Sequence, residues 1–251
     1  MAEIHCNSID NIQWVNLLPG PFTVHNGIHV WRVKVSESIK FIHRFLLLLN
    51  TAEKEKASAY KLEQEQQRRI ISRAALRILL GKYILLPPEK IEFLKMPDHK
   101  PFVRNADNID LHYNLSHSGD WVAIAISDKP VGIDVESIDP NFNFKELMPT
   151  YFSDYETRFI IHSGQPPENF YTMWTRKEAV LKANSKAISD DISLIPCLDG
   201  HHEVDPGVID SSDNWRVSSF HFEESCVGSI AYKLFGQNIL FMEAADLLNE
   251  L

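Results

Sequence analysis

The segment that most constrains the fold is residues 131–136, Val-Gly-Ile-Asp-Val-Glu, in which apolar and polar residues alternate. A period of two places successive side chains on opposite faces of a β-strand, so the acidic pair Asp134 and Glu136 shares one face. Two carboxylates at this spacing can bind one hard cation such as Mg²⁺. The pattern also fits the solvent-exposed face of an edge strand, and for this segment alone that simpler interpretation is favoured.

A second patterned segment, residues 174–182, reads Trp-Thr-Arg-Lys-Glu-Ala-Val-Leu-Lys and predicts an α-helix. Trp174, Glu178 and Lys182 recur one turn apart, so their side chains stack on one helix face. A Glu–Lys pair at this spacing is ordinarily a surface ion pair worth about 0.3–0.5 kcal/mol. Together with the strand, however, the helix completes a set of three carboxylates and one ammonium group. That set is suited to holding Mg²⁺ against a diphosphate.

Composition and charge narrow the class of protein. With 251 residues, 44% of them hydrophobic and 24% charged, the chain resembles an ordinary soluble globular protein. No apolar run approaches the ~18 residues of a membrane span, and the first residues lack the order of a secretory signal. The three cysteines, Cys6, Cys197 and Cys226, are too widely spaced to indicate a disulfide framework. A net charge of −9 argues against nucleic-acid binding. We therefore expect a cytoplasmic protein without a membrane or nucleic-acid partner.

One segment, residues 54–82, departs from the acidic average because it holds eight basic and three acidic residues. Arg69, Arg73 and Arg77 recur at i, i+4 and i+8, which places them on one stripe of a predicted helix. Like charges at this spacing repel, so an anion bound between them would relieve a cost. A solvated helix face is the simpler alternative.

Secondary-structure patterns occur in a similar order twice along the chain. The first part predicts a strand at 28–35, helices at 39–50 and 52–84, and extended segments within 91–128. A turn signal at 128–130 separates the two parts. The second part predicts a strand at 131–136, helices at 144–149, 151–162 and 169–183, and strands at 215–222 and 226–235. We therefore predict an α+β fold of two similar halves, residues 1–129 and 130–251.

Other polar pairs have simpler explanations than acyl-transfer catalysis. Ser116 and His117 are adjacent on a predicted strand, so their side chains point to opposite faces and cannot form a dyad. No Gly-x-Ser-x-Gly sequence surrounds this serine, and a phosphate-contacting role suits the pair better. Glu156 follows Ser153 by three residues, and this capping box explains Glu156 without catalysis.

Taken together, five segments resemble the 4′-phosphopantetheinyl transferases, specifically their larger Sfp-like type. The segments are Lys100-Pro101, 114–118 (Asn-Leu-Ser-His-Ser), 132–136, 152–156 (Phe-Ser-Asp-Tyr-Glu) and 174–182. The strand motif alone is a weak signal, but the strand motif followed at this distance by the helix motif is a strong one. The resemblance implies two similar α+β halves in a pseudo-twofold arrangement, a monomer, and coenzyme A at the interface of the halves.

The resemblance also implies a reaction. The phosphopantetheine arm of coenzyme A moves to a serine hydroxyl of an apo acyl or peptidyl carrier protein, and adenosine 3′,5′-bisphosphate is released. Asp134, Glu136 and Glu178 match the family's Mg²⁺ ligands, and Glu178 also matches the candidate general base for the carrier serine. Lys182 matches a lysine on the diphosphate that stabilises developing charge. The expected catalytic residues are thus Glu178, Lys182 and Asp134.

Further matched residues are expected to bind coenzyme A. Lys100, Ser116 and His117 match contacts to its phosphates and adenine end, and Lys54 and Arg69 match basic residues near the 3′-phosphate. The next two arginines of the basic segment have no assigned contact.

Two departures from the family pattern and two alternative functions accompany this assignment. His99 stands where the family often has glycine before Lys-Pro, and Ser185-Lys186-Ala187 replaces a common Gly-x-Gly, which predicts another loop path there. The alternatives are another Mg²⁺-dependent phosphate-transfer enzyme or phosphodiesterase, and a non-enzymatic protein that only binds coenzyme A or a carrier. The sequence does not distinguish carriers of the fatty-acid, polyketide, peptide-synthetase and aminoadipate-reductase types.

Overall fold

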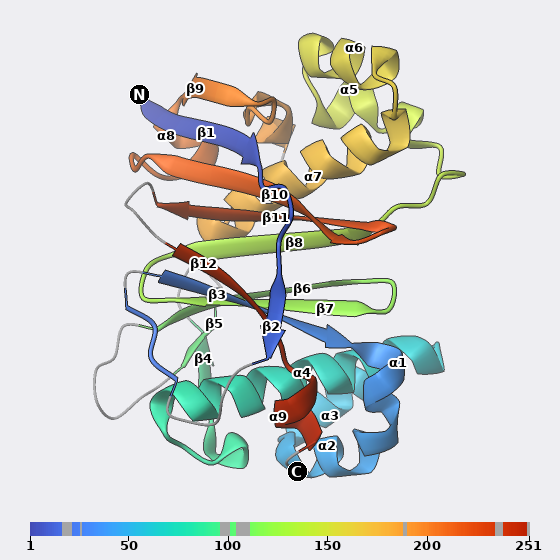
Figure 1. Ribbon diagram of the computed structural model, residues 1–251, viewed down its shortest axis with the longest axis vertical. Helices are drawn as coiled ribbons and strands as arrows, with labels where there is room; N and C mark the ends of the chain where they lie inside the picture. The colour runs from blue at the N-terminus through green and yellow to red at the C-terminus, as the bar shows by residue number, and fades with distance from the viewer. Residues whose placement is uncertain are drawn as a thin grey trace. The chain divides into compact units, whose positions relative to one another are not determined.

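The chain folds into two compact α+β units, each built on one five-stranded sheet (Figure 1). The computed structural model describes residues 1–16, 22–25, 27–95, 101–103, 111–187, 190–233 and 238–249. Unit 1 comprises Met1–Ile12 and Lys129–Gln237, and unit 2 comprises Gln13–Asp128 and Asn238–Leu251. The predicted α+β fold class is confirmed. No helix in these described ranges is long and apolar enough to cross a membrane.

Unit 1 packs the long helix α7 against its sheet. The strands are β1 (Ala2–Ser8), β8 (Val131–Ser137), β9 (Gly200–Val204), β10 (Trp215–Glu223) and β11 (Cys226–Lys233), in the order β8-β11-β10-β1-β9. The helices are α5 (Met148–Tyr151), α6 (Asp154–His162), α7 (Pro166–Ala183) and α8 (Pro206–Ile209). Ala179, Val180 and Ala183 of α7 join the buried apolar cluster of the sheet. This burial fixes which face of α7 points inward.

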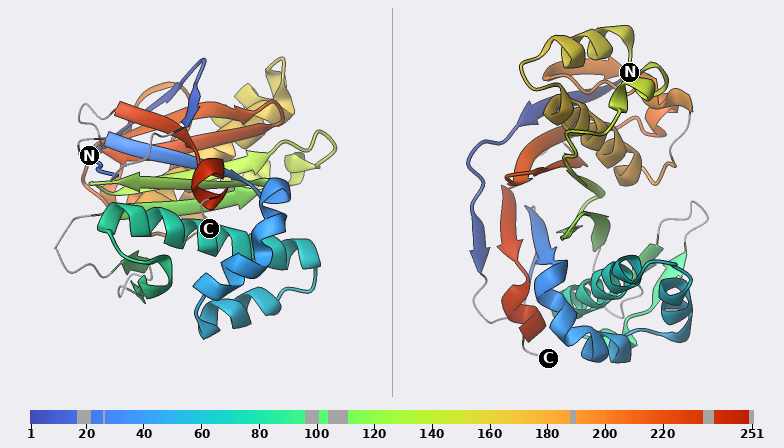
Figure 2. Two further views of the ribbon diagram at one scale, coloured as in Figure 1. Left: turned by 60° about the horizontal axis from the view of Figure 1, so that its bottom comes forward. Right: turned by 90° about the vertical axis from the view of Figure 1, so that its right-hand side faces the viewer.

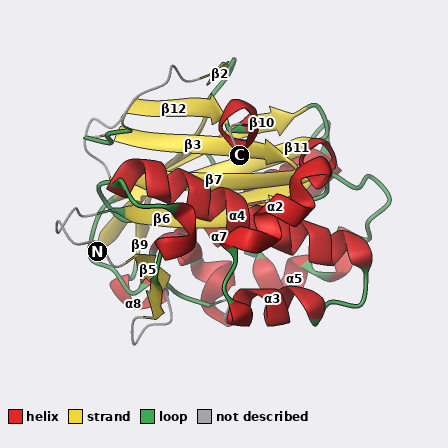
Figure 3. Cartoon of the chain, turned by 90° about the horizontal axis from the view of Figure 1, so that it is seen from below, coloured by secondary structure: helices red, strands yellow, loops and turns green. Residues whose placement is uncertain are grey.

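Unit 2 packs its longest helix, α4, against a second sheet. The strands of that sheet are β2 (Trp14–Asn16), β3 (Gly27–Lys34), β6 (His112–Ser118), β7 (Trp121–Ser127) and β12 (Asn238–Glu243), in the order β2-β12-β3-β7-β6. A separate pair is formed by β4 (Phe93–Lys95) and β5 (Pro101–Val103). The helices are α1 (Val35–Ser38), α2 (Ile42–Leu48), α3 (Thr51–Ser58), α4 (Glu63–Ile84) and α9 (Ala245–Asn249). Helices α1, α2 and α3 contact α4 (Figure 2), which lies across β6 and β7 (Figure 3).

Each end of the chain adds a strand to the sheet formed mainly by the opposite half of the sequence. Strand β1 pairs in parallel with β10 and antiparallel with β9, so residues 1–12 belong with the second half of the chain. Strand β12 pairs in parallel with β3 and β2, so residues from 238 onward belong with the first half. The units therefore differ from the predicted halves, residues 1–129 and 130–251, at both ends. The reason is strand pairing between segments that are far apart in sequence.

Candidate active site

Strand β8 and helix α7 come into backbone contact at Gly132. A Cβ atom added at Gly132 would lie within 3.0 Å of three backbone atoms of α7, namely Ala179 O, Ala183 N and Ala183 Cα. Only a residue without a side chain permits this approach. Asp134 lies on the same strand face as Gly132, and it is 3% exposed. The close approach thus brings the acidic face of β8 beneath α7. The alternative interpretation of this segment, a solvent-exposed strand face, does not hold for Asp134.

The predicted carboxylates and lysine lie together at this contact. Lys182 Nζ lies 2.6 Å from Asp134 Oδ1, an ion pair between the end of α7 and the middle of β8. Glu178 is 9% exposed, and among the described residues its Oε1 has no hydrogen-bond partner. Burial, followed by repulsion from Asp134 and Glu136, raises the pKa of Glu178 to about 7, although Lys182 opposes the shift. The site therefore contains a buried carboxylate that can gain or lose a proton near neutral pH.

The donor set suits Mg²⁺ in its chemistry. Three carboxylates within electrostatic reach of one another repel, and a divalent cation with oxygen ligands would remove that cost. The buried Glu178 Oε1 offers such a ligand atom. In the described part of the chain, no three His, Cys, Asp or Glu side chains are arranged to hold a metal ion as they stand. The cation that contacts Asp134 is the ammonium group of Lys182.

An aromatic pocket adjoins the acidic face. Its volume is about 260 Å³, and it is lined by Glu136, Phe142, Leu147, Phe170, Tyr171 and Trp174. Trp174 packs edge-on against Tyr151, with ring centroids 5.0 Å apart, and is thereby held in the wall of the pocket. The first residue of the helix motif therefore shapes the pocket beside the carboxylates.

Lys177, next to Glu178, has a structural role that the sequence pattern did not indicate. Its side chain is fully buried, and its Nζ donates to Glu156 Oε2 at 3.0 Å and to Ile195 O at 2.5 Å. Glu156 also closes the predicted capping box with Ser153 at the start of α6, and this prediction is confirmed. The signal available in the sequence was a lysine on the apolar side of a helix, which requires a buried partner.

In unit 2, the basic stripe on α4 already holds an anion from its own chain. Glu53 Oε1 lies 2.7 Å from Arg73 Nη2, and Glu53 Oε2 lies 2.9 Å from Arg77 Nε. Burial alone would raise the pKa of Glu53, but the two arginines outweigh it and the pKa is lowered. The anion that lies between Arg73 and Arg77 is therefore the Glu53 carboxylate. Arg69 is half-buried, and among the described residues its Nε has no hydrogen-bond partner.

The remaining predicted contacts to coenzyme A also belong to unit 2. Lys54 is exposed on α3, Ser116 is buried on β6, and the adjacent His117 is half-buried. Lys100 lies outside the described residues, as does the departure at residue 99. Their roles toward the coenzyme stay predictions.

The second departure falls at the end of α7. Ser185 adopts φ 61°, the left-handed conformation that glycine adopts most easily. Lys186 Nζ donates to Val208 O at 2.8 Å and so fastens the segment to α8. Ser185 therefore adopts the left-handed backbone conformation in this loop without a glycine.

Comparison with known proteins assigns the family. Residues 130–231 match the 4′-phosphopantetheinyl transferase superfamily, and residues 31–129 match the N-terminal region of 4′-phosphopantetheinyl transferase. A Synechocystis protein with the name "Putative 4′-phosphopantetheinyl transferase" is 30% identical over 178 residues, which cover 68% of this chain and 72% of the relative. The chain belongs to the 4′-phosphopantetheinyl transferase superfamily.

Two further 4′-phosphopantetheinyl transferases support this assignment. HetI of Nostoc is 25% identical over 232 residues, covering 89% of this chain and 94% of HetI. Sfp of Bacillus subtilis is 26% identical over 185 residues, covering 65% of this chain and 81% of Sfp. The predicted family and transferase activity are confirmed, and the Sfp-like type stays a prediction. The two family matches also meet at residues 129 and 130, the predicted boundary.

Proposed function

We propose that Glu178, Lys182 and Asp134 carry out the transfer of the phosphopantetheine arm from coenzyme A to a serine of an apo carrier protein. The observation that carries this proposal is the buried Glu178 carboxylate beside the Asp134–Lys182 ion pair; in the metal-free protein its pKa is about 7, which suits it to accept a proton at neutral pH. A serine hydroxyl is a poor nucleophile until a base within hydrogen-bond reach removes its proton. Glu178 lies on a rigid helix beside a fixed ammonium–carboxylate pair, which supports this role.

The proposed step balances as a phosphoryl transfer. The carrier serine oxygen forms a bond to the phosphorus that bears the pantetheine arm, and the bond from that phosphorus to the bridging oxygen breaks. Glu178 takes the serine proton, and adenosine 3′,5′-bisphosphate leaves. The Lys182 ammonium stabilises the charge that grows on the leaving phosphate. Asp134 holds Lys182 in position through the 2.6 Å ion pair.

We also propose Mg²⁺ as the metal, held by Asp134, Glu136 and Glu178. Its contribution when bound is to neutralise charge on the diphosphate oxygens. Repulsion among the three carboxylates supports this assignment. Titration of the protein with Mg²⁺, followed by calorimetry, tests it independently of turnover. Asp134→Asn should weaken the binding, and binding unchanged by that variant would contradict the assignment.

The activity is tested by incubating the protein with coenzyme A, Mg²⁺ and a panel of apo carriers, followed by mass spectrometry of the carrier. We expect a mass gain equal to the arm with wild type and no gain with Glu178→Gln. The matched control is Glu168→Gln, which removes a carboxylate from the same helix where Glu168 Oε1 lies 3.3 Å from His221 Nε2. An active Glu178→Gln variant would overturn the proposed base. Loss of coenzyme A without a gain in carrier mass would favour a phosphodiesterase instead.

Lys54 and Arg69 are proposed to contact the 3′-phosphate of coenzyme A. The Arg69 Nε, which is buried and has no hydrogen-bond partner within the described ranges, supports this role. Neutralising either residue should raise KM for coenzyme A more than KM for 3′-dephospho-coenzyme A. Lys56→Gln, which like Lys54 changes an exposed lysine of α3, serves as the control. Equal effects on both coenzymes would contradict the assignment.

We further propose a monomeric enzyme of the cytoplasm. All three cysteines are free and buried, which suits a reducing compartment. Sedimentation of the wild-type protein tests the monomer, and a stable dimer would contradict it.

A further inference from the structure

A row of hydroxyl side chains crosses the sheet of unit 1 beneath α7. Ser229 of β11 is the register partner of Asp134 on β8, and Ser219 of β10 is the partner of Ser229. Ser8 of β1 continues the row as the partner of Ser219. Residues that pair across neighbouring strands share one face of the sheet. The three serines therefore extend in a line from Asp134, on the face that α7 covers.

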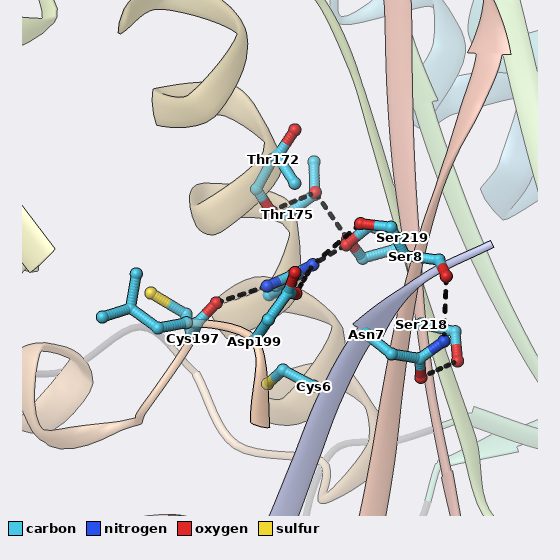
Figure 4. Close-up of polar contacts among 12 residues, drawn as sticks. Cys6, Asn7, Ser8, Thr172, Thr175, Cys197, Asp199, Ser218 and Ser219 are labelled. Carbon is cyan, nitrogen blue, oxygen red and sulfur yellow. Dashed lines mark hydrogen bonds and ion pairs between the residues drawn. The ribbon is translucent and has the colours of Figure 1, made fainter. Parts of the chain in front are cut away.

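Hydrogen bonds connect two serines of this row to side chains of helix α7. Arg176 Nε donates to Ser219 Oγ at 2.7 Å, and Thr175 Oγ1 donates to Thr172 O at 2.9 Å (Figure 4). Between these ends, Ser219 Oγ lies 2.9 Å from Ser229 Oγ, which lies 2.8 Å from Thr175 Oγ1.

The direction of each hydrogen bond in this chain is fixed by its ends. A guanidinium can only donate and a carbonyl can only accept. Each hydroxyl group has only one proton to donate. Because the Thr175 proton goes to the Thr172 carbonyl, Ser229 must donate to Thr175, and Ser219 must then donate to Ser229. Each hydroxyl donates once and accepts once, so the chain leaves α7, crosses two strands and returns to α7.

Arg176 uses its other donors to hold two more segments. Its Nη1 donates to Cys197 O at 2.7 Å, and its Nη2 donates to Asp199 Oδ1 at 2.7 Å and to Ser8 Oγ at 3.3 Å (Figure 4). The Arg176 side chain is only 4% exposed. A buried guanidinium charge is costly unless it is paired and hydrogen-bonded, and these partners supply both the carboxylate and the hydrogen-bond acceptors. One side chain on α7 thus contacts β1, β10 and the segment before β9.

We propose that Arg176, Ser219, Ser229 and Thr175 are positioning residues that set the register of α7 on the sheet. Glu178 follows Arg176 by two residues, and Asp134 ends the hydroxyl row. A rotation or slide of α7 would break the hydrogen bonds from Arg176 to Ser219 and from Ser229 to Thr175. The same movement would carry Glu178 and Lys182 away from Asp134. The proposal rests on the proposed function of those three residues. It assigns no contact with substrate to the four positioning residues.

The structure offers a matched pair of variants for the test. Ser218 and Ser219 are neighbours on β10, and they are 1% and 3% exposed. Ser218 Oγ donates to Asn7 Oδ1 at 3.0 Å and lies 3.2 Å from Tyr232 Oη, on the face away from α7. Ser218→Ala and Ser219→Ala therefore each remove one buried hydroxyl and its contacts. Only Ser219→Ala removes a contact to α7.

We expect Ser219→Ala to lower kcat in the carrier assay by about tenfold or more, with KM for coenzyme A little changed, because misplacement of about 1 Å can cost ~100-fold. Ser218→Ala should lose similar thermal stability and keep its kcat. Thr175→Val tests the chain from the helix side and replaces Ser219→Ala if that variant does not fold. The double variant Ser219→Ala/Thr175→Val should lose no more than the larger single loss.

The outcomes separate this proposal from the catalytic assignment. Glu178→Gln is assayed in parallel. If it is inactive while Ser219→Ala and Thr175→Val keep wild-type kcat, the catalytic assignment stands and the positioning role is overturned. Equal kcat losses in Ser218→Ala and Ser219→Ala also overturn the positioning role. If Glu178→Gln is active, the catalytic assignment fails and the positioning role fails with it.

Discussion

Gly132→Ala adds one methyl group at the point where the strand and helix of the candidate active site are closest. The new Cβ would lie 2.9 Å from Ala183 Cα, where ordinary contacts are 3.4–4 Å, and closer still to Ala179 O. All the opposing atoms belong to backbone, so no side chain can rotate away. Helix α7 must move from β8 by on the order of 1 Å, which carries Glu178 and Lys182 away from Asp134. Overpacking of this kind costs about 1–3 kcal/mol of stability.

We expect Gly132→Ala to lower kcat by roughly 100-fold, because reacting groups misplaced by about 1 Å lose a factor of this size. The assay follows the carrier mass with time, and urea denaturation measures the stability of the same samples. Gly164→Ala is the matched control, because a Cβ at Gly164 meets no atom within 4 Å. A Gly132→Ala variant with wild-type kcat would refute the reasoning that the close approach positions the site. Equal losses in both variants would refute it as well.

Two further predictions concern the pH dependence of stability. The folded-state pKa of Glu53 is lowered, so its stabilising contribution is present above the unfolded pKa and is lost as the pH falls through the folded value. Glu53→Gln should therefore lower the free energy of unfolding by roughly 3 kcal/mol at pH 7, and by less near pH 3. Urea denaturation at both values checks this, and a constant difference contradicts it. The pKa of Glu178 is instead raised to about 7, so the metal-free folded state loses stability as the pH rises from 4.5 to about 7. Glu178→Gln should be more stable than wild type at pH 8, by on the order of 3 kcal/mol, and no more stable at pH 4; a variant less stable at pH 8 would contradict this.

The arrangement of Arg73 and Arg77 shows where reasoning from sequence reaches its limit. Their spacing on one helix stripe indicated that a bound anion would relieve their repulsion, and it left a solvated helix face as the alternative. The anion is Glu53 of the preceding helix, which the capping box with Asn50 sets at the start of α3. A helix period reports which side chains share a face, but not which other element packs against that face.

The same limit explains the unit boundaries and the polar contacts beneath α7. Strand β1 alternates buried Ala2, Ile4 and Cys6 with more exposed residues, yet no local pattern says that it pairs with β10. Ser219 and Ser229 lie on the consecutive strands β10 and β11, but Ser8 joins their row only because the distant strand β1 pairs with β10 in a particular register.

The sequence by itself predicted strand β8 and helix α7 and the reactive groups they carry, because strand and helix periods are local properties of the backbone, whereas the helix predicted over residues 52–84 is two helices, α3 and α4. It determined that Asp134 and Glu136 share a strand face and that Glu178 and Lys182 share a helix face. The tertiary structure alone decided that these faces meet, since burial depends on residues distant in the chain. Backbone contact at Gly132 brings them together, and the resulting burial raises the pKa of Glu178 to about 7. A solvent-exposed carboxylate with the same neighbours in sequence would stay ionised at neutral pH.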